Sequence, residues 1–231
     1  MTPDAFDPAE LASIPDLPGA RMPGAEPSWA PPPPPRPEDR GPTRAAVTYR
    51  RRVAFVASLA WLALLLLLLG LRHDLSFSPV VLVHVGLPAL LGAAALFAAL
   101  SPGPAGLGPS ARTTLALALG APLAFAISAV LFPRFEDGHR FAAAFFCGDF
   151  GLLLGALPLA TLAWAQRRTC AAAAPWRSAL IGVSMGLVGA ATLGMHCANG
   201  DGLHVALGHG WPVVVLGTAG FVLVGRVTRV R

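Results

Sequence analysis

The residues of this chain that are able to do chemistry gather in one short stretch near the C-terminus. Cys197, His196, His204 and His209 all fall within MHCANGDGLHVALGHGW, residues 195–211. Thiolate and imidazole are the ligands that zinc and other soft transition metals prefer, and thiols can also be oxidised. Long apolar segments flank the stretch, so its role depends on where those segments place it.

The composition is that of a membrane protein. Of 231 residues, 55% are hydrophobic and 13% are charged, whereas about 25% are charged in soluble domains. From residue 53 onward the chain forms six apolar segments, each near the ~20 residues needed to cross a ~30 Å hydrocarbon core. The predicted fold class is therefore all-α, a polytopic six-helix transmembrane bundle. The helices are expected near 53–71, 79–100, 113–132, 141–165, 178–196 and 203–225.

The first 49 residues contain no run long enough to enter a membrane. Five consecutive prolines, residues 31–35, favour an extended polyproline II spacer. Asp7 or Pro8 could begin a short amphipathic helix. We therefore expect a disordered, proline-rich cytoplasmic tail at 1–49 with a small helix near its tip, and a transmembrane domain at 50–231. A tail that is disordered throughout and has no specific role is the alternative. No cleavable secretory signal is expected.

The arginines orient the helices. All 17 basic residues are Arg, and cytoplasmic loops of membrane proteins carry an excess of positive charge. With both termini inside, only three arginines fall in outer loops, so the sequence predicts an N-in, C-in protein of the bacterial inner membrane. The cytoplasmic set is Arg21, Arg36, Arg40, Arg44, Arg50, Arg51, Arg52, Arg112, Arg167, Arg168, Arg177, Arg226, Arg229 and Arg231, and the outer set is Arg72, Arg134 and Arg140.

In this orientation two of the three cysteines form a pair. Cys147 lies twenty residues before Arg167, and Cys197 lies twenty residues after Arg177. Those arginines flank the inner turn between the fourth and fifth helices. At ~1.5 Å per residue, both cysteines lie ~30 Å above the turn, on adjacent antiparallel helices. They could form a disulfide if their Cα atoms come within ~7 Å, or share a soft metal ion with imidazoles.

In the predicted orientation, all six histidines lie in outer loops or toward the outer side of the membrane. His73 and His139 lie in outer loops, His84 lies near the outer end of the second helix, and the other three flank the last outer loop. A tetrahedral zinc site at the cysteine pair would need only two further ligands. No cofactor is certain, and zinc or another soft metal ion is the possible one. The candidate ligands are Cys147, Cys197, His196, His204, His209 and Asp149.

Two alternatives stay open for these residues. The cysteines could be small hydrophobic side chains packed between helices. His196 and Cys197 point roughly 100° apart on a helix, so both can bind one ion only if the helix ends there; Asn199 and Gly200 make such an ending plausible. Cys170, in the predicted inner loop, is interpreted as an incidental thiol.

Two further patterns describe helix packing. Gly182 and Gly186 form a GxxxG motif, extended by Gly189, that lets a neighbouring backbone approach closely. Four prolines fall inside the apolar segments, where membrane helices tolerate them with local adjustment of the backbone. They are Pro88, Pro122, Pro158 and Pro212.

Several of these features together resemble the NrsF-type anti-sigma proteins. They are six helices with both termini inside, a cysteine at the outer start of the fourth helix, the run PLATLAWAQRR, a glycine-rich fifth helix ending in MHC, and a final histidine-bearing segment. The resemblance covers residues 141–231 in motif detail and 53–132 by hydropathy. Residues 1–49 depart from it, since the family's tails are shorter and poorer in proline.

The resemblance implies a function. NrsF-type proteins are bacterial inner-membrane proteins that hold an extracytoplasmic-function (ECF) sigma factor inactive. The family carries two cysteines that sense metal or oxidative stress, and these map onto Cys147 and Cys197. His196 corresponds to the histidine of the same family motif. The implied partner is a cytoplasmic ECF sigma factor, and the cysteine pair is expected to shift the fourth and fifth helices to release it.

Two other classes are weighed against this hypothesis. A small metal-ion transporter or channel with an outer His/Cys entry site would need ionisable residues deeper in the helices, and the segments below Asp149 and His84 are apolar. A haem- or quinone-handling enzyme would need facing histidine pairs at two depths. The chain also lacks HExxH and a phosphate-binding glycine loop. We therefore expect a regulator that is not an enzyme and does not bind nucleic acid directly.

Overall fold

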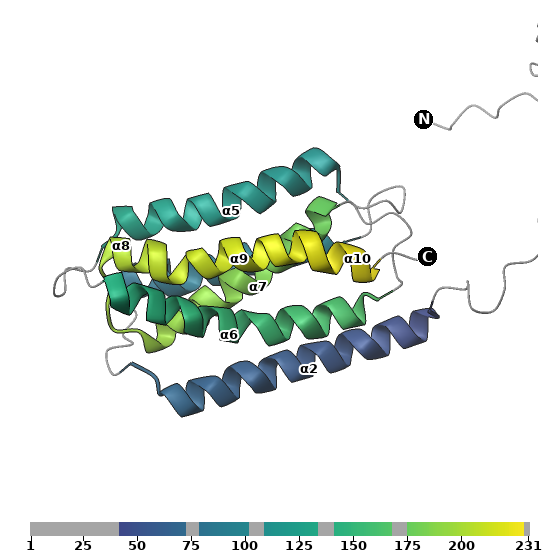
Figure 1. Cartoon of the computed structure of the whole chain (residues 1–231), viewed down its shortest axis with the longest axis horizontal. Helices are drawn as coiled ribbons and strands as arrows, with labels where there is room; N and C mark the ends of the chain where they lie inside the picture. Colours follow the sequence, from purple (N-terminus) through teal and green to yellow (C-terminus); the bar gives the residue numbers. More distant parts are fainter. Residues whose placement is uncertain (1–41, 73–78, 102–108, 134–140, 168–174, 229–231) are drawn as a thin grey trace, which may run out of the picture. The chain divides into compact units, whose positions relative to one another are not determined.

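Helices account for the architecture of the residues that the computed structural model describes, which are 42–72, 79–101, 109–133, 141–167 and 175–228. Six helices in this part are long and apolar enough to cross a membrane, and these residues contain no strand. This confirms the predicted all-α, six-helix fold class (Figure 1).

The helices occupy the predicted segments. The first, third, fourth and fifth are α2 (Arg44–Leu69), α5 (Ala111–Leu131), α6 (Phe141–Ala165) and α7 (Pro175–His196). The second and the sixth are interrupted by π-helical turns. The second consists of α3 (Pro79–Val81), η2 (Leu82–Gly86) and α4 (Leu87–Leu100). The sixth consists of α8 (Gly202–His204), η3 (Val205–His209), α9 (Trp211–Ala219), η4 (Gly220–Val224) and α10 (Gly225–Thr228).

The first helix begins earlier than the hydropathy predicts. Thr43 caps it, because the threonine hydroxyl accepts a hydrogen bond from the Ala46 N–H at 3.2 Å. The polar first turns, rich in arginine, therefore continue the apolar helix, and residues 44–49 of the predicted tail are helical. Residues 1–41, with the proline run and the predicted short helix, lie outside the described residues, so the division at 49/50 stays a prediction.

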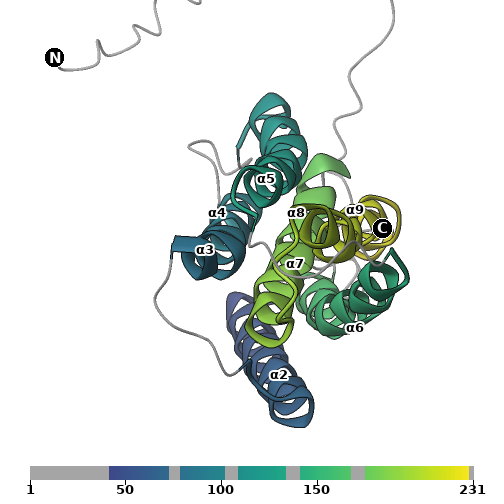
Figure 2. The same ribbon diagram turned by 90° about the vertical axis from the view of Figure 1, so that its left-hand side faces the viewer.

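Helix α7 lies at the centre of the bundle and α2 lies at its edge. In its most apolar 18-residue window, α7 is 89% buried, whereas α2 is 11% buried. Figure 2 shows α7 surrounded by the other long helices, with α2 on the outside. The central helix therefore positions the others.

The glycine motif explains how α7 reaches its neighbours. A Cβ on Gly186 would lie 2.5 Å from the Val213 Cα, and one on Gly182 would collide with the Leu216 carbonyl, both on α9. A Cβ on Gly189 would lie 2.9 Å from the Gly151 carbonyl oxygen of α6. Backbone approaches this close are possible only without a side chain, which confirms the predicted packing role of the motif.

Two of the four prolines follow π-helical turns. Pro88 follows η2, and Pro212 follows η3. A proline has no N–H for the carbonyl four residues earlier, and a π turn is one of the local adjustments that membrane helices use at prolines. Both turns carry histidine, because η2 contains His84 and η3 ends at His209.

The two ends of the bundle differ in charge. The end where α2, α5 and α7 begin and α4, α6 and α10 finish is called the arginine end (Figure 1). Of the described arginines only Arg72 belongs to the opposite end. The arginine end is also held together by arginine. The Arg177 guanidinium donates to the Ala99 carbonyl at 2.9 Å and the Ser101 carbonyl at 3.0 Å, and Arg51 donates to Gln166 at 3.5 Å.

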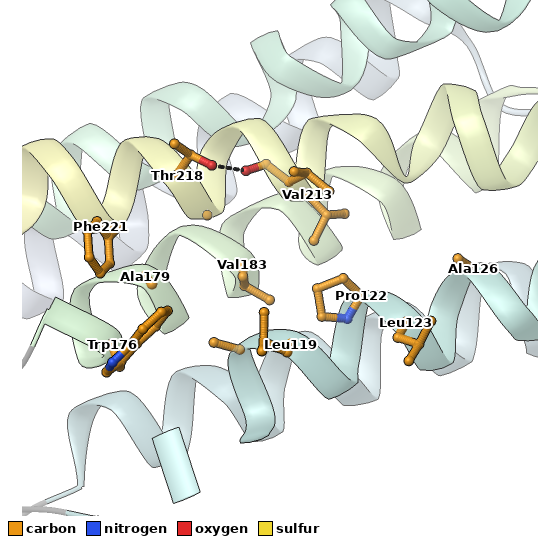
Figure 3. A pocket seen from close by; sticks show the side chains of 13 residues that line it. Leu119, Pro122, Leu123, Ala126, Trp176, Ala179, Val183, Val213, Thr218 and Phe221 are labelled. Atoms are coloured by element: carbon orange, nitrogen blue, oxygen red, sulfur yellow. Dashed lines mark hydrogen bonds between the residues drawn. The ribbon is translucent and has the colours of Figure 1, made fainter. Parts of the chain in front are cut away.

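An apolar groove of about 530 Å³ runs along α5, α7 and α9 (Figure 3). No titratable side chain lines it. The hydroxyl of Thr218 at its wall already donates to the Val214 carbonyl in its own helix at 2.9 Å. The lining of this groove therefore offers no ionisable group for chemistry.

Candidate thiol–imidazole site

The predicted cysteine pair meets at the end opposite to the arginines. Cys147 lies in the second turn of α6, and Cys197 directly follows the last residue of α7. Their sulfur atoms are 3.8 Å apart, and both thiols are free. The matched spacing from the inner turn therefore places the two residues correctly. A disulfide bond is ~2.05 Å long, so the two sulfurs are in contact without being bonded.

Two histidines from the sixth helix complete the group. The Nε2 atom of His204 lies 3.4 Å from the Cys197 sulfur, and the His204 and His209 rings are 5.8 Å apart between centroids. One ligand atom from each of Cys147, Cys197, His204 and His209 can be chosen so that all four lie within 4.8 Å of one another. These four residues are called the thiol–imidazole cluster.

The backbone between Cys197 and His204 turns the chain back into the bundle. After α7 ends, the Asn199 side chain accepts from the Asp201 N–H at 2.9 Å, and the Asp201 carboxylate accepts from the His204 N–H at 2.9 Å. The second contact caps α8. The cap therefore fixes the start of the sixth helix where His204 faces Cys197.

The π turn η3 explains why His204 and His209 can share a site. Residues five apart on an α-helix point roughly 140° away from each other, at 3.6 residues per turn. In a π turn, by contrast, the residue five positions on lies about one turn above. His204 directly precedes η3 and His209 ends it, so the two rings come to the same side of the helix.

Two distances within the cluster are close to those of a tetrahedral metal site. With zinc–sulfur bonds of ~2.3 Å and zinc–nitrogen bonds of ~2.05 Å, a tetrahedron has a sulfur–sulfur edge of ~3.8 Å and a sulfur–nitrogen edge of ~3.6 Å. The observed separations are 3.8 Å for Cys147 to Cys197 and 3.4 Å for Cys197 to His204. All four ligand atoms lie within 4.8 Å of one another, so the cluster could hold a metal ion.

The two imidazoles of the cluster have buried nitrogen atoms that make no hydrogen bond to another described residue. His204 and His209 are 4% and 1% exposed. Within the described part of the chain, Nδ1 of His204 and both ring nitrogens of His209 are buried without a hydrogen-bond partner. Leaving a buried polar group unpaired costs about 1–3 kcal/mol. A cation bound at the cluster would use the lone pair of one nitrogen on each ring.

The Cys197 thiol lies in surroundings that favour its ionised form. Its hydrogen bond with Cys147 lowers the pKa of Cys197 from the ordinary thiol value, although burial acts in the opposite direction. Contacts with His204 and His209 lower the pKa further. The thiolate is the form that binds metals and reacts with oxidants.

A third buried imidazole lies near the cluster. His84 of η2 is 4% exposed, its ring is hydrogen-bonded to the backbone of Phe132, and it interacts electrostatically with His209. Its Nε2 atom has no partner among the described residues. The sequence predicts that His84 lies near the outer end of the second helix. No spacing along the chain indicates that it lies beside the sixth helix.

The structure does not bring the other two candidate ligands into the cluster. The Nδ1 atom of His196 is 2.9 Å from the Gly70 carbonyl oxygen. Asp149 is exposed, because two residues after Cys147 on α6 it faces nearly the opposite side of the helix. Neither belongs to the group of four in the described residues.

The fold and the site together define a class of protein: a polytopic helical bundle with two thiols and two buried imidazoles at one end and arginines at the other. The chain matches the family model NrsF, negative regulator of sigma F, over residues 38–229, and it belongs to this family. No curated protein and no solved structure matches it. The family description implies that the protein regulates a sigma factor negatively, a role that is not enzymatic.

Proposed function

We propose that the protein is a membrane-bound anti-sigma factor that holds an ECF sigma factor inactive and releases it when the thiol–imidazole cluster changes state. Membership of the NrsF family supports the regulatory role. The observation that carries the sensing role is the convergence of two thiols and two buried imidazoles from three helices on one point. A chain that needed small packing residues there would have no reason to bury two histidines with unpaired nitrogens.

The charge difference between the two ends supports the orientation. The positive-inside rule assigns the arginine end to the cytoplasm, which gives an N-in, C-in protein in a bacterial inner membrane. The cluster then lies toward the oxidising outer compartment, where thiol chemistry can persist. The sigma factor binds on the cytoplasmic side, at the tail, the inner loops or the C-terminal residues.

Two chemical events could change the cluster. A soft divalent ion such as zinc would bind the four ligands and displace the thiol protons. Alternatively, a two-electron oxidant such as hydrogen peroxide would join the two sulfurs. Both thiol hydrogens would then leave with the oxidant, which is reduced to two waters. Both events pull Cys147 and Cys197 into a defined geometry, so one sensor could serve either signal.

A sigma-dependent reporter in cells tests this proposal. Replacing Cys147 and Cys197 with Ser should abolish induction by metal or peroxide while repression in unstressed cells is kept. Cys170→Ser is the matched control, because it removes a cysteine that the sequence places in an inner loop. An unchanged response in the double variant would contradict the sensor role. Co-purification of the sigma factor with and without residues 1–49 tests whether the tail contributes to binding.

The alternative function, a metal-ion transporter or channel, finds little support in the central helix. The buried polar side chains along α7 are Ser178, Ser184 and Thr192. Ser184 and Thr192 already donate to the carbonyls of Gly92 and Val188, both at 2.9 Å. An ion leaving the cluster would meet no charged ligand along this helix. Metal uptake by proteoliposomes containing the purified protein would nevertheless favour transport.

A further inference from the structure

The end of α2 is tied to the segment that carries Cys197. The Arg72 guanidinium donates to the Cys197 carbonyl at 3.0 Å, and the Arg72 backbone N–H donates to the Met195 carbonyl at 3.0 Å. His196 lies 2.9 Å from the Gly70 carbonyl oxygen. These three contacts, called the α2 clamp, join the first helix to residues 195–197. The segment that carries Cys197 is therefore hydrogen-bonded to the end of α2.

Helix α2 is the long helix that can move most easily. Along its length it packs mainly on α6. Leu65 is buried against Leu154 and Leu193, and polar contacts also join α2 to α6. Ser58 and Thr161 are 3.2 Å apart between hydroxyl oxygens, and the Trp61 indole donates to the Leu153 carbonyl at 3.0 Å. Toward the arginine end, a cavity of about 360 Å³ separates α2 from α4 and α7. A helix that borders a cavity has fewer packing contacts to break when it tilts than a helix packed on all sides.

Helix α7, by contrast, is held against its neighbours. Its glycines bring its backbone into direct contact with α9 and α6, and a Cβ would clash at Gly182, Gly186 and Gly189. Shifting α7 would separate these close backbone contacts. Of the helices connected to Cys197, α2 therefore offers the lowest resistance to a movement along the bundle.

We infer that α2 transmits the state of the cluster to the arginine end, with Arg72 as the positioning residue that couples it to Cys197. This inference rests on the proposed function and names the helix that carries its output. When the sulfur of Cys197 moves toward a bound ion, the backbone of residues 195–197 moves with it and carries the α2 clamp along. The movement then changes the contacts of Arg50 and Arg51 at the other end of α2, which hold Arg167 and Gln166 at 3.4 and 3.5 Å.

The tryptophans of the chain allow a direct test on the full-length protein. Trp211 packs against Gly148, one residue from Cys147, and so reports on the cluster. Trp61 bonds to Leu153, and the Trp164 ring lies 6.0 Å from the Arg50 guanidinium, so both report on the α2 and α6 interface. We would label the protein with 5-fluorotryptophan, assign each resonance with Trp→Phe variants, and record ¹⁹F spectra in nanodiscs with and without saturating Zn²⁺.

The inference predicts that Zn²⁺ shifts the resonances of Trp211, Trp61 and Trp164 in the unmodified sequence. In R72M, and more completely in R72M with H196A, Trp211 should still shift while the Trp61 and Trp164 shifts are lost. R112M, which removes an exposed arginine at the arginine end, is the matched control and should keep all three shifts.

Each of the other outcomes contradicts a specific part of the inference. If Trp211 shifts while Trp61 and Trp164 do not, metal binding stands and transmission through α2 is wrong. If the Trp61 and Trp164 shifts survive in the double variant, the Arg72 and His196 side chains do not couple Cys197 to α2, and the inference is wrong. If Zn²⁺ leaves Trp211 unchanged, metal sensing at the cluster fails, and the inference that rests on it fails as well.

Discussion

The geometry of the cluster predicts how a metal ion would be coordinated there. For two sulfurs 3.8 Å apart, an ion with a tetrahedral angle between them lies ~2.3 Å from each, which is the usual zinc–sulfur distance. The sulfur–nitrogen distance of 3.4 Å is within ~0.2 Å of the tetrahedral edge. We therefore expect a four-coordinate ion with two sulfur and two nitrogen ligands.

X-ray absorption on the Zn²⁺-loaded protein measures the ligand count, and Co²⁺ substitution reports the geometry through its visible spectrum. Changing a residue that hydrogen-bonds to a metal ligand costs about 10–100-fold in metal affinity, so removing a ligand itself should cost at least ~100-fold. Cys147→Ser, Cys197→Ser, His204→Ala and His209→Ala are each expected to do so. Asp149→Asn and His196→Ala are the controls, because neither side chain belongs to the cluster.

Two results would refute this reasoning. An ion with only oxygen ligands, or with octahedral coordination, would show that the four side chains do not bind one ion together. An affinity that falls with Asp149→Asn or His196→Ala as much as with the four cluster variants would show that the metal binds elsewhere at this end of the bundle. Each result would also remove the basis for metal sensing in the proposed function.

Three further outcomes follow from contacts in the bundle. Peroxide should convert the two cluster thiols into a disulfide, seen as the loss of two hydrogens by mass spectrometry, and bound Zn²⁺ should prevent it; formation at the same rate with Zn²⁺ would contradict a shared site. Gly186→Ala should destabilise the protein by about 1–3 kcal/mol, because its Cβ would lie 2.5 Å from the Val213 Cα. Gly120→Ala, with no atom within 4 Å of its Cβ, should be tolerated, and equal melting temperatures in detergent would contradict the packing argument. Ser184→Ala, which removes the buried bond to α4, should cost about 0.6–1.7 kcal/mol, whereas Thr218→Ala should have little effect, since its hydroxyl bonds within its own helix; denaturation curves compare the two.

Much of the fold was predictable because a membrane reduces the problem to length and hydropathy. Five of the six helices both begin and end within three residues of the expected positions. The exception is the start of α2, where Thr43 caps a polar extension that hydropathy does not register. The cysteine pair was predictable for a similar reason, since helices fix the rise per residue and two equal spacings from one turn reach the same level.

The choice among the histidines was not predictable, because it depends on how two helix ends are built. His196 is adjacent to Cys197 in the chain, yet the end of α7 turns it toward Gly70. The spacing of five between His204 and His209 argues against a shared site on an α-helix and becomes favourable only in a π turn. Pro212, three residues after His209, is the one signal of that turn, since it leaves the carbonyl of Gly208 without its usual donor. Because many membrane helices accommodate proline without a π turn, this signal alone could not have paired the two histidines. The turn therefore assembles the site, and a change that restored regular α-helix at 205–209 should separate the two imidazoles even though every ligand residue is retained.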